Sequence, residues 1–387
     1  NYVKRKLNSF TLDFQKKGGQ NLLLSDMADW NPSEIIGTNP NPLSYSLYDF
    51  LIMNYSWCKG RENLGYQKPN SRKLMYKIGN KPYVRLENSF TSFFPESFPE
   101  KLKKKLLNYY MKKIGNNPFL HDKIEFYIII SCFDMSVPNR LKEMEKSGFS
   151  KKETKFIEKE VIKLTNNLIL NFNLTLNDCQ KSIKKLEEKR NEKKRKQNLT
   201  NLNNRKLLLK TELLLNECKS YGTIPFATMA RLAFVASALL KSMLEQKIIS
   251  SDEYYSIFST VNSPMIEYQK DLHTLSKKHT SKKKFLEKYG HLRPGTYDIT
   301  IKRYDENKID MTTINLKKEI KNNFRKNNLI DKTLKKYGLE FDFNQLINFI
   351  REALYYREKF KMEFTKNISE SLEIILKVGE KMNFTRE

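Results

Sequence analysis

The chain has few residues of several kinds, and each scarcity excludes a class of protein. It has 13 glycines and 12 prolines in 387 residues, too few for a collagen-like or loop-dominated chain. Its four cysteines form no C-x-x-C pair, which indicates unpaired thiols in a reducing compartment. Its four histidines lack the spacing of metal ligands, so we expect no metal site.

Long hydrophobic runs are also missing. The most apolar stretch, Leu232–Leu240, has nine residues, whereas a membrane-spanning helix needs about 18 or more. No apolar stretch with a small-residue cleavage site opens the chain, so we expect no signal peptide. These absences predict a soluble, cytoplasmic protein without a membrane partner. The chain begins with Asn1 inside a polar, basic stretch, and we therefore expect it to be part of a longer polypeptide.

Positive charge dominates the chain, with 71 Lys and Arg against 44 Asp and Glu and a net charge of +27. Nucleic-acid binding would use such an excess, but most of the charge is Lys, whereas phosphate recognition favours the Arg fork. The densest basic run, Lys181–Lys196, has glutamates at helical pairing distance and too few apolar residues to bury a face. We interpret it as the exposed tip of a helical hairpin on a solvated basic surface.

Hydrophobic periodicity predicts a small sheet followed by a helical body. The β-rich runs 74–78 and 83–86 flank Gly79–Pro82, which predicts a β-hairpin. The β-branched and aromatic stretch Lys123–Phe133 predicts a strand that pairs with this hairpin. Helical spacing is found at 42–57, 99–113, 151–172, 176–197, 202–219, 225–247, 252–277, 343–354 and 368–376.

The predicted fold is therefore α+β and mainly α, with a small antiparallel sheet near the N-terminus and a large helical body. We divide the chain into a mixed α/β part, residues 1–137, and a helical part, residues 138–387. The helical part contains the charged hairpin, at about 151–220, and a non-helical loop, His291–Asp298.

This loop has the densest group of polar side chains in the chain. Gly290 is placed to end the preceding helix, and a proline–glycine pair inside the loop predicts a tight turn. His291 and Arg293 precede Tyr297 and Asp298 on this irregular backbone. Loops held by rigid elements often carry binding residues. An Arg293–Asp298 pair that only ties the loop to its neighbouring helices explains the same residues equally well.

A second polar cluster is the segment Asp29–Gly37. Asp29 and Asn31 are candidates for ligand binding, and either of them would also cap a helical turn that begins at Pro32. The capping interpretation is the favoured one.

The third cluster, Arg85–Phe93, follows the predicted hairpin. If it is a strand, Arg85, Glu87 and Ser89 share one face and Asn88 lies on the other. An arginine with hydroxyl and amide neighbours can grip a carboxylate or a phosphate. A surface ion pair between Arg85 and Glu87 accounts for the pattern as well.

Motifs for nucleotide binding and nucleophilic catalysis are missing. The sequence has no G-x-x-x-x-G-K-[ST], no G-x-G-x-x-G and no G-x-S-x-G. By itself the chain therefore lacks a complete catalytic apparatus.

Several segments, taken together, resemble the phosphoenolpyruvate-synthase-like phosphotransferases, a family that includes rifampin phosphotransferase and the L-glutamine kinases of capsule biosynthesis. The segments run in order across most of the chain, and the last is the most specific. They are Asp29–Gly37, Pro42–Tyr48, Tyr83–Phe93, Gly222–Arg231 and Phe285–Asp298.

The resemblance implies a three-part enzyme. An ATP-grasp domain binds ATP and Mg²⁺, a swivelling domain carries a phosphorylated histidine, and a central domain binds the acceptor. The swivelling domain's Thr-Ser-His signature is not found, because His279–Ser281 has these residues in another order, and the ATP-grasp part is missing too. The chain thus resembles the acceptor-binding domain alone, which binds no cofactor and is inactive without the other two domains.

On this resemblance the partner is a small acceptor, either an amino acid such as L-glutamine or a pyruvate-like compound. We expect His291 to orient the acceptor or relay a proton, and Arg293 to clamp the phosphoryl group. The residues expected to bind substrate are Arg85, Asn88, Ser89, Ser92, Tyr297, Asp298, Asp29 and Asn31. This hypothesis requires His291 and Arg293 to meet Arg85 in one pocket.

The alternative hypothesis belongs to another class of protein. A basic helical module would bind nucleic acid or an acidic partner, and its affinity would fall steeply with salt. Because the charge is mainly Lys, a nucleic-acid partner is not the expected one.

Overall fold

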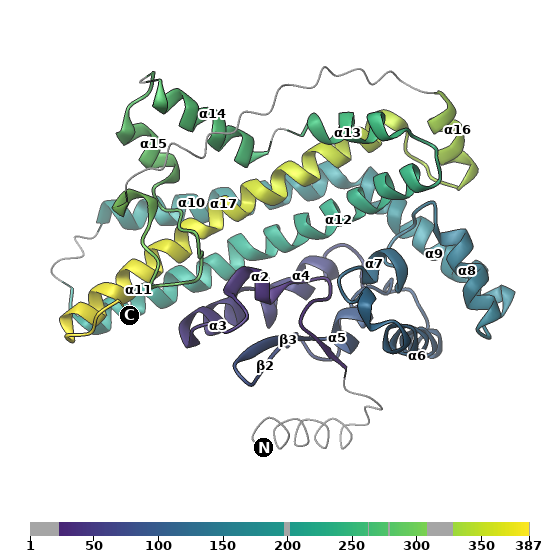
Figure 1. Ribbon diagram of the computed structural model, residues 1–387, viewed down its shortest axis with the longest axis horizontal. Coiled ribbons are helices and arrows are strands. Elements are labelled where there is room, and N and C mark those ends of the chain that lie inside the picture. The colour runs from purple at the N-terminus through teal and green to yellow at the C-terminus, as the bar shows by residue number, and fades with distance from the viewer. Residues whose placement is uncertain (1–22, 197–201, 262, 278, 308–327, 387) are drawn as a thin grey trace. The chain divides into compact units, whose positions relative to one another are not determined.

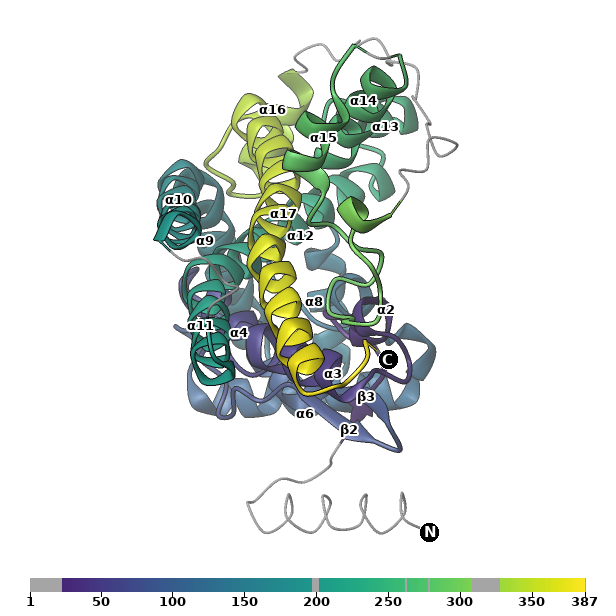
Figure 2. The same cartoon turned by 90° about the vertical axis from the view of Figure 1, so that its left-hand side faces the viewer.

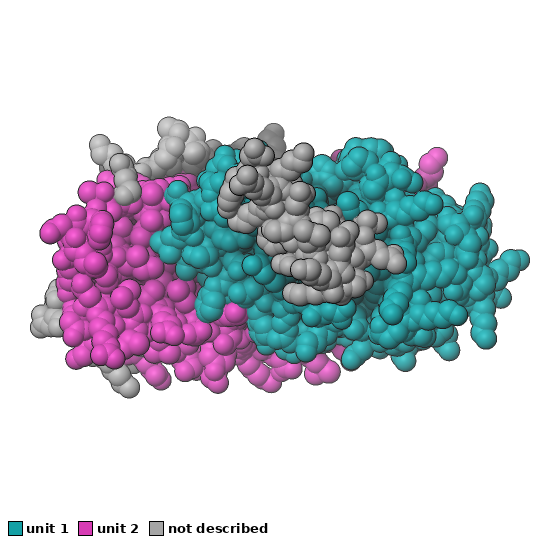
Figure 3. All heavy atoms as spheres, turned by 90° about the horizontal axis from the view of Figure 1, so that it is seen from below, with its two compact units in different colours: residues 1–168, 335–340 teal, residues 169–334, 341–387 magenta. Residues whose placement is uncertain are grey.

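The computed structural model describes residues 23–196, 202–261, 263–277, 279–307 and 328–386 (Figures 1 and 2). Helices account for 68 % of the structure, with a three-stranded antiparallel sheet near the N-terminus, which confirms the predicted mainly helical α+β class. The chain forms two compact units (Figure 3). Unit 1 contains residues 1–168 and 335–340, and unit 2 contains residues 169–334 and 341–387. The predicted domains, 1–137 and 138–387, stay a prediction.

The sheet of unit 1 has the strand order β1-β3-β2, formed by β1 (Leu24–Ser25), β2 (Met75–Ile78) and β3 (Lys81–Arg85). β2 and β3 form the predicted hairpin. Gly79 and Asn80 join them with φ angles of 56° and 66°. Two left-handed residues in succession match the twist of the flanking strands, which explains a Gly-Asn pair at this turn.

The strand predicted over Lys123–Phe133 is wrong. Ile124–Tyr127 form helix α7, and the isoleucines that follow are buried on irregular backbone. Side chains satisfy this backbone: Arg140 donates to the carbonyl of Ile129, and Thr165 Oγ1 accepts from the amide of Phe133 at 2.8 Å. β1 takes the place of the third strand.

Helices precede and follow the hairpin in the sequence of unit 1, and α2, α3 and η2 begin at prolines. The stretch predicted as one helix over 42–57 is divided into α3, a π-helical turn η1 and α4. The helical elements are α2 (Pro32–Ile36), α3 (Pro42–Tyr48), η1 (Asp49–Met53), α4 (Ser56–Glu62), α5 (Leu86–Thr91), α6 (Glu100–Asn116), η2 (Pro118–Leu120), α7 (Ile124–Tyr127), α8 (Val137–Lys146) and α9 (Lys151–Leu170), whose last residues belong to unit 2.

Unit 2 is a bundle of long helices in which α12 and α17 run side by side (Figures 1 and 2). α12 is buried around most of its circumference, as the sequence predicts. The helix predicted over 252–277 is two helices, because Pro264 begins the second and Ser263 caps it. The helical elements are α10 (Phe172–Lys196), α11 (Asn204–Glu217), η4 (Cys218–Thr223), α12 (Ile224–Glu245), α13 (Ser251–Ser259), α14 (Pro264–Ser276), α15 (Lys282–Tyr289), η5 (Tyr304–Glu306), α16 (Asn328–Lys336), whose last residues belong to unit 1, and α17 (Phe343–Lys381).

The basic run Lys181–Lys196 does bury a face, contrary to expectation. Ile183 and Leu186 are buried, and Arg190 is only 4 % exposed. Arg190 Nη1 donates to Asn367 Oδ1 at 3.0 Å, and its Nη2 lies 3.3 Å from Glu363 Oε2. A polar contact with α17 thus replaces the missing apolar residues. Lys181–Lys196, predicted as the exposed tip of a helical hairpin, therefore forms the last part of α10 and contacts α17.

One helical stretch, Asn204–Glu245, is long and apolar enough to cross a membrane, and 78 % of its most apolar part is buried within the structure. A core helix of a soluble protein has the same properties. The predicted absence of a membrane partner and the predicted cytoplasmic location therefore stay predictions.

A π-helical turn, η4, joins α11 to α12 and brings Gly222 against α17. A Cβ atom at Gly222 would lie 2.7 Å from Phe364 Cβ and 3.0 Å from Leu186 Cδ2. Such a contact is too close for a methyl group, so the glycine sets the distance between these helices.

We expect Gly222→Ala to destabilise unit 2 by about 1–3 kcal/mol, because the added methyl group forces the packed helices apart. Urea unfolding followed by circular dichroism measures the change. Gly379→Ala is the matched control, since a Cβ atom there meets only an ordinary contact, 3.7 Å from Phe384 Cβ. Equal stability of the two variants would contradict the proposed role of Gly222.

Candidate functional site

Asp29, a predicted site residue, lies in a buried polar network of unit 1. Its Oδ2 pairs with the Arg61 guanidinium, and its Oδ1 accepts a hydrogen bond from Ser89. Arg61 also donates to Ser92 Oγ, which in turn donates to the carbonyl of Ser89 at 2.6 Å. The Arg61 and Asp29 side chains are 5 % and 1 % exposed. Three predicted site residues from two separated segments therefore meet at Arg61, and we call these four residues the Arg61 network.

Arg61 was not predicted as a site residue. It lies on α4, and its guanidinium is 4.0 Å from the ring centre of Phe93 and 5.4 Å from that of Trp57. Aromatic faces stabilise a desolvated cation. The sequence offered one signal, because Trp57 precedes Arg61 by four residues and the two therefore share a helix face. Arg61 and Asp29 lie on different segments, so no local sequence pattern predicts that they pair.

The neighbouring candidates make local contacts. Asn31 Oδ1 accepts from the amide of Glu34 at 3.1 Å, and its Nδ2 donates to Glu34 Oε2 at 3.0 Å. This N-cap of α2 confirms the capping interpretation of Asn31. Asn88 Nδ2 donates to the carbonyl of Lys73 at 2.8 Å.

The strand geometry predicted for Arg85–Phe93 is wrong, because β3 ends at Arg85 and α5 begins at the next residue. Strand alternation therefore does not place Arg85, Glu87 and Ser89 on one face. Arg85 does pair with Glu87, as the ion-pair interpretation predicts. The change to helical geometry turns Ser89 inward, where it is fully buried beside Asp29.

The loop that follows α15 in unit 2 begins after Gly290 and contains a tight turn, as predicted. The helix ends at Gly290, where a Cβ atom would lie 2.5 Å from the carbonyl oxygen of Leu286 and 3.1 Å from Asp305 Cβ. Only glycine fits there. The predicted tight turn is closed by a hydrogen bond of 2.9 Å from the amide of Asp298 to the carbonyl of Gly295.

Arg293 ties this loop to α17. Its Nη2 donates to Glu373 Oε1 at 2.8 Å and to Ser369 Oγ at 3.5 Å. Its Nη1 donates to the carbonyls of Asp298 and Ile301 at 3.3 and 3.2 Å. The side chain is 1 % exposed. The predicted pairing of Arg293 with Asp298 is thus a hydrogen bond to the main-chain carbonyl of Asp298. The carboxylate that pairs with Arg293 is that of Glu373.

Tyr297 and Asp298 contribute to the shape of the loop as well. Tyr297 is buried. Asp298 Oδ1 accepts from the amide and the hydroxyl of Thr300 at 2.9 and 2.8 Å. These contacts fix the backbone around Arg293.

His291 is the unusual group of the loop. Its Nε2 is buried and has no hydrogen-bond partner among the described residues. Burial, followed by the nearby Lys366 ammonium, lowers the pKa of His291 to about 3. A neutral imidazole has one nitrogen available as an acceptor. His291 and Arg293 line a cavity of about 10 Å³, together with side chains that include Thr365 and Ser369, and such a volume holds about one water molecule.

Arg85 belongs to unit 1, whereas His291 and Arg293 belong to unit 2. Their predicted meeting in one pocket therefore stays a prediction.

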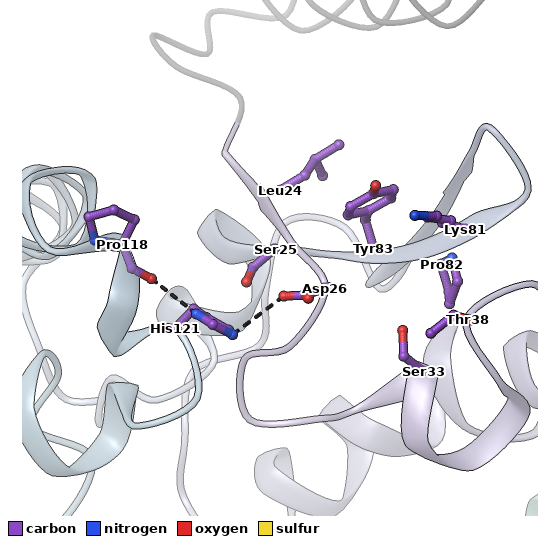
Figure 4. A pocket seen from close by; sticks show the side chains of 10 residues that line it. All are labelled: Leu24, Ser25, Asp26, Ser33, Thr38, Lys81, Pro82, Tyr83, Pro118 and His121. Atoms are coloured by element: carbon purple, nitrogen blue, oxygen red, sulfur yellow. Dashed lines mark hydrogen bonds and ion pairs between the residues drawn. The ribbon is translucent and has the colours of Figure 1, made fainter.

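Unit 1 also has a larger cleft, of about 390 Å³ (Figure 4). It lies beside β1, α2 and β3, and polar and apolar groups share its lining about equally. Ser33 and Tyr83, which line it, belong to two of the segments that carry the family resemblance. The lining residues are Leu24, Ser25, Asp26, Ser33, Thr38, Lys81, Pro82, Tyr83, Pro118 and His121.

Metal-ligating groups do not gather in the part of the chain that the structure describes, where no three His, Cys, Asp or Glu side chains lie together. A scan against protein-family models finds no match, and searches of curated proteins and of solved structures find none either. The family resemblance therefore stays a prediction.

Proposed function

We propose that this chain is the acceptor-binding part of a multidomain ATP-dependent phosphotransferase that uses a swivelling phosphohistidine domain. The acceptor is an amino acid such as L-glutamine. One observation carries the proposal: two segments that resemble the family, Asp29–Gly37 and Tyr83–Phe93, meet through the Arg61 network. Segments that resemble the family separately in the sequence are here neighbours in space, as parts of one site would be.

The chemistry assigned to this chain is binding and positioning. Phosphoryl transfer depends mainly on how the reactants are placed and on stabilisation of charge. ATP and Mg²⁺ are placed on another domain, as the resemblance implies. The Arg61 network is too enclosed to contact an acceptor, so its role is to hold the segment after β1 against α5.

His291 has the properties of a hydrogen-bond acceptor. It is neutral at physiological pH, because burial lowers its pKa to about 3, and the residue lines a cavity the size of one water molecule. An imidazole in this state can accept a hydrogen bond, so the acceptor-orienting role suits His291 better than the proton-relay role. Arg293 acts through the loop that it anchors.

The net charge of +27 supports a second function, in which the chain binds nucleic acid or an acidic protein. Exposed lysines on α6, such as Lys101 and Lys104, would make the contacts. Ionic strength separates the two functions, because phosphate contacts release counterions.

We expect isothermal titration calorimetry to show saturable binding of L-glutamine to the chain. The affinity should change by less than about threefold between about 50 and 200 mM salt, whereas a complex with six to ten phosphate contacts loses about 10³–10⁵-fold. A DNA duplex and pyruvate are the comparison ligands. Steeply salt-dependent DNA binding without binding of L-glutamine or pyruvate would contradict the proposal.

A further inference from the structure

The cleft of unit 1 carries charges of both signs at separate places. Asp26 follows β1, and its side chain is 65 % exposed. Lys81 begins β3 and is exposed. In Figure 4, Asp26 lies between His121 on one side and Lys81, Thr38 and Ser33 on the other.

His121 lies beside Asp26 on the acidic side of the cleft. His121 Nδ1 donates to the carbonyl of Pro118 at 3.0 Å, which fixes the imidazole ring. Its Nε2 then lies 3.6 Å from Asp26 Oδ1. The Asp26 side chain is largely exposed, so its carboxylate can accept hydrogen bonds from a bound ammonium group.

The basic side has a different set of groups. Lys81 has no ion-pair partner in the described ranges, and Ser33 and Thr38, which carry hydroxyl groups, line the same cleft. An ammonium group with neighbouring hydroxyl donors is suited to a carboxylate.

We infer that this cleft binds a free α-amino acid, with its ammonium group at Asp26 and its carboxylate at Lys81. The inference rests on the proposed function, since it assigns the acceptor to this cleft. The volume of about 390 Å³ lies within the range of small-molecule sites. The Asp26 carboxylate would repel a simple anion, and the Lys81 ammonium group would repel a simple cation. A molecule that carries both charges therefore fits best.

The test combines each charge-removing variant with a ligand that lacks the group which the replaced residue is inferred to bind. Asp26→Asn and Lys81→Met are titrated calorimetrically with L-glutamine, with 4-carbamoylbutanoate, which lacks the ammonium group, and with 4-aminobutanamide, which lacks the carboxylate. Lys101→Met is the matched control, because Lys101 is an exposed lysine of the same unit that does not line the cleft.

We expect each cleft variant to weaken L-glutamine binding by about tenfold or more. Asp26→Asn should not weaken the binding of 4-carbamoylbutanoate, and Lys81→Met should not weaken that of 4-aminobutanamide, because each variant removes a charge that repels that ligand. Lys101→Met should bind L-glutamine as the parent chain does.

The possible failures are distinct. If L-glutamine binds the parent chain and both cleft variants equally well, the cleft is not the acceptor site, although the proposed function stands. If no amino acid binds the parent chain, the amino-acid acceptor itself is contradicted, and the cleft assignment with it.

Discussion

Replacing Arg61 with Met should destabilise unit 1 by about 3–5 kcal/mol, because the substitution leaves a buried carboxylate without its counter-ion. Asp29, whose side chain is 1 % exposed, would keep only the hydrogen bond from Ser89. Both tryptophans of the chain, Trp30 and Trp57, belong to unit 1. Urea unfolding followed by tryptophan fluorescence therefore reports on this unit.

Two further variants test the cause of this loss. Lys113→Met removes an ion pair whose partner, Glu143, is 58 % exposed, and we expect a cost below about 1 kcal/mol. Arg61→Met combined with Asp29→Leu removes both charges and should recover part of the stability. A double variant less stable than Arg61→Met alone would show that lost packing, rather than an unpaired charge, explains the effect.

The stability of unit 2 should fall as the pH is lowered from about 6.5, by up to about 1.4 kcal/mol per pH unit, because of His291. The pKa of His291 is about 3 in the folded chain and about 6.5 in an unfolded chain. Between these values the unfolded state binds a proton that the folded state does not, so protonation favours unfolding. Above about pH 6.5 the contribution is constant, because neither state is protonated.

The contribution of His291 is measured as a difference between variants. His291→Gln should flatten the pH dependence of unfolding, followed by circular dichroism, while His279→Gln, at an exposed position of the same unit, should leave it unchanged. The imidazole resonances of His291 should not shift between about pH 8 and 5 in NMR spectra. A titration of His291 near pH 6 would contradict its buried, neutral state.

Local pattern predicts much of this fold, because the pattern reflects backbone geometry and one-sided burial. The Gly79–Asn80 turn, the core helix α12 and the helix end at Gly290 are all visible in the sequence. The misread segment, Lys123–Phe133, has the composition of a strand. Its isoleucines are buried without sheet pairing, since Arg140 donates to the carbonyl of Ile129 and the Tyr110 hydroxyl accepts from the amide of Ile130. The composition of this segment predicts that it is buried, but it does not predict which groups form hydrogen bonds with its backbone.

The candidate site, like the fold, could be predicted only in part from the sequence. A local concentration of polar residues in the sequence identified Asp29, Ser89 and Arg293 as candidates. In the structure each of these side chains forms buried polar contacts. Their partners, Arg61 and Glu373, lie far away in the sequence, at positions where ordinary helix surface is an equally good explanation. Charge pairing across such separations leaves no local spacing to read.

Hydrogen–deuterium exchange of the chain with and without saturating L-glutamine tests the central claim most directly, because it locates the bound acceptor. Slower exchange should appear at residues 24–38 and 81–93, where the cleft and the resembling segments lie. Unchanged exchange throughout the chain at saturating L-glutamine, with protection of α6 by a DNA duplex instead, would contradict an acceptor-binding function.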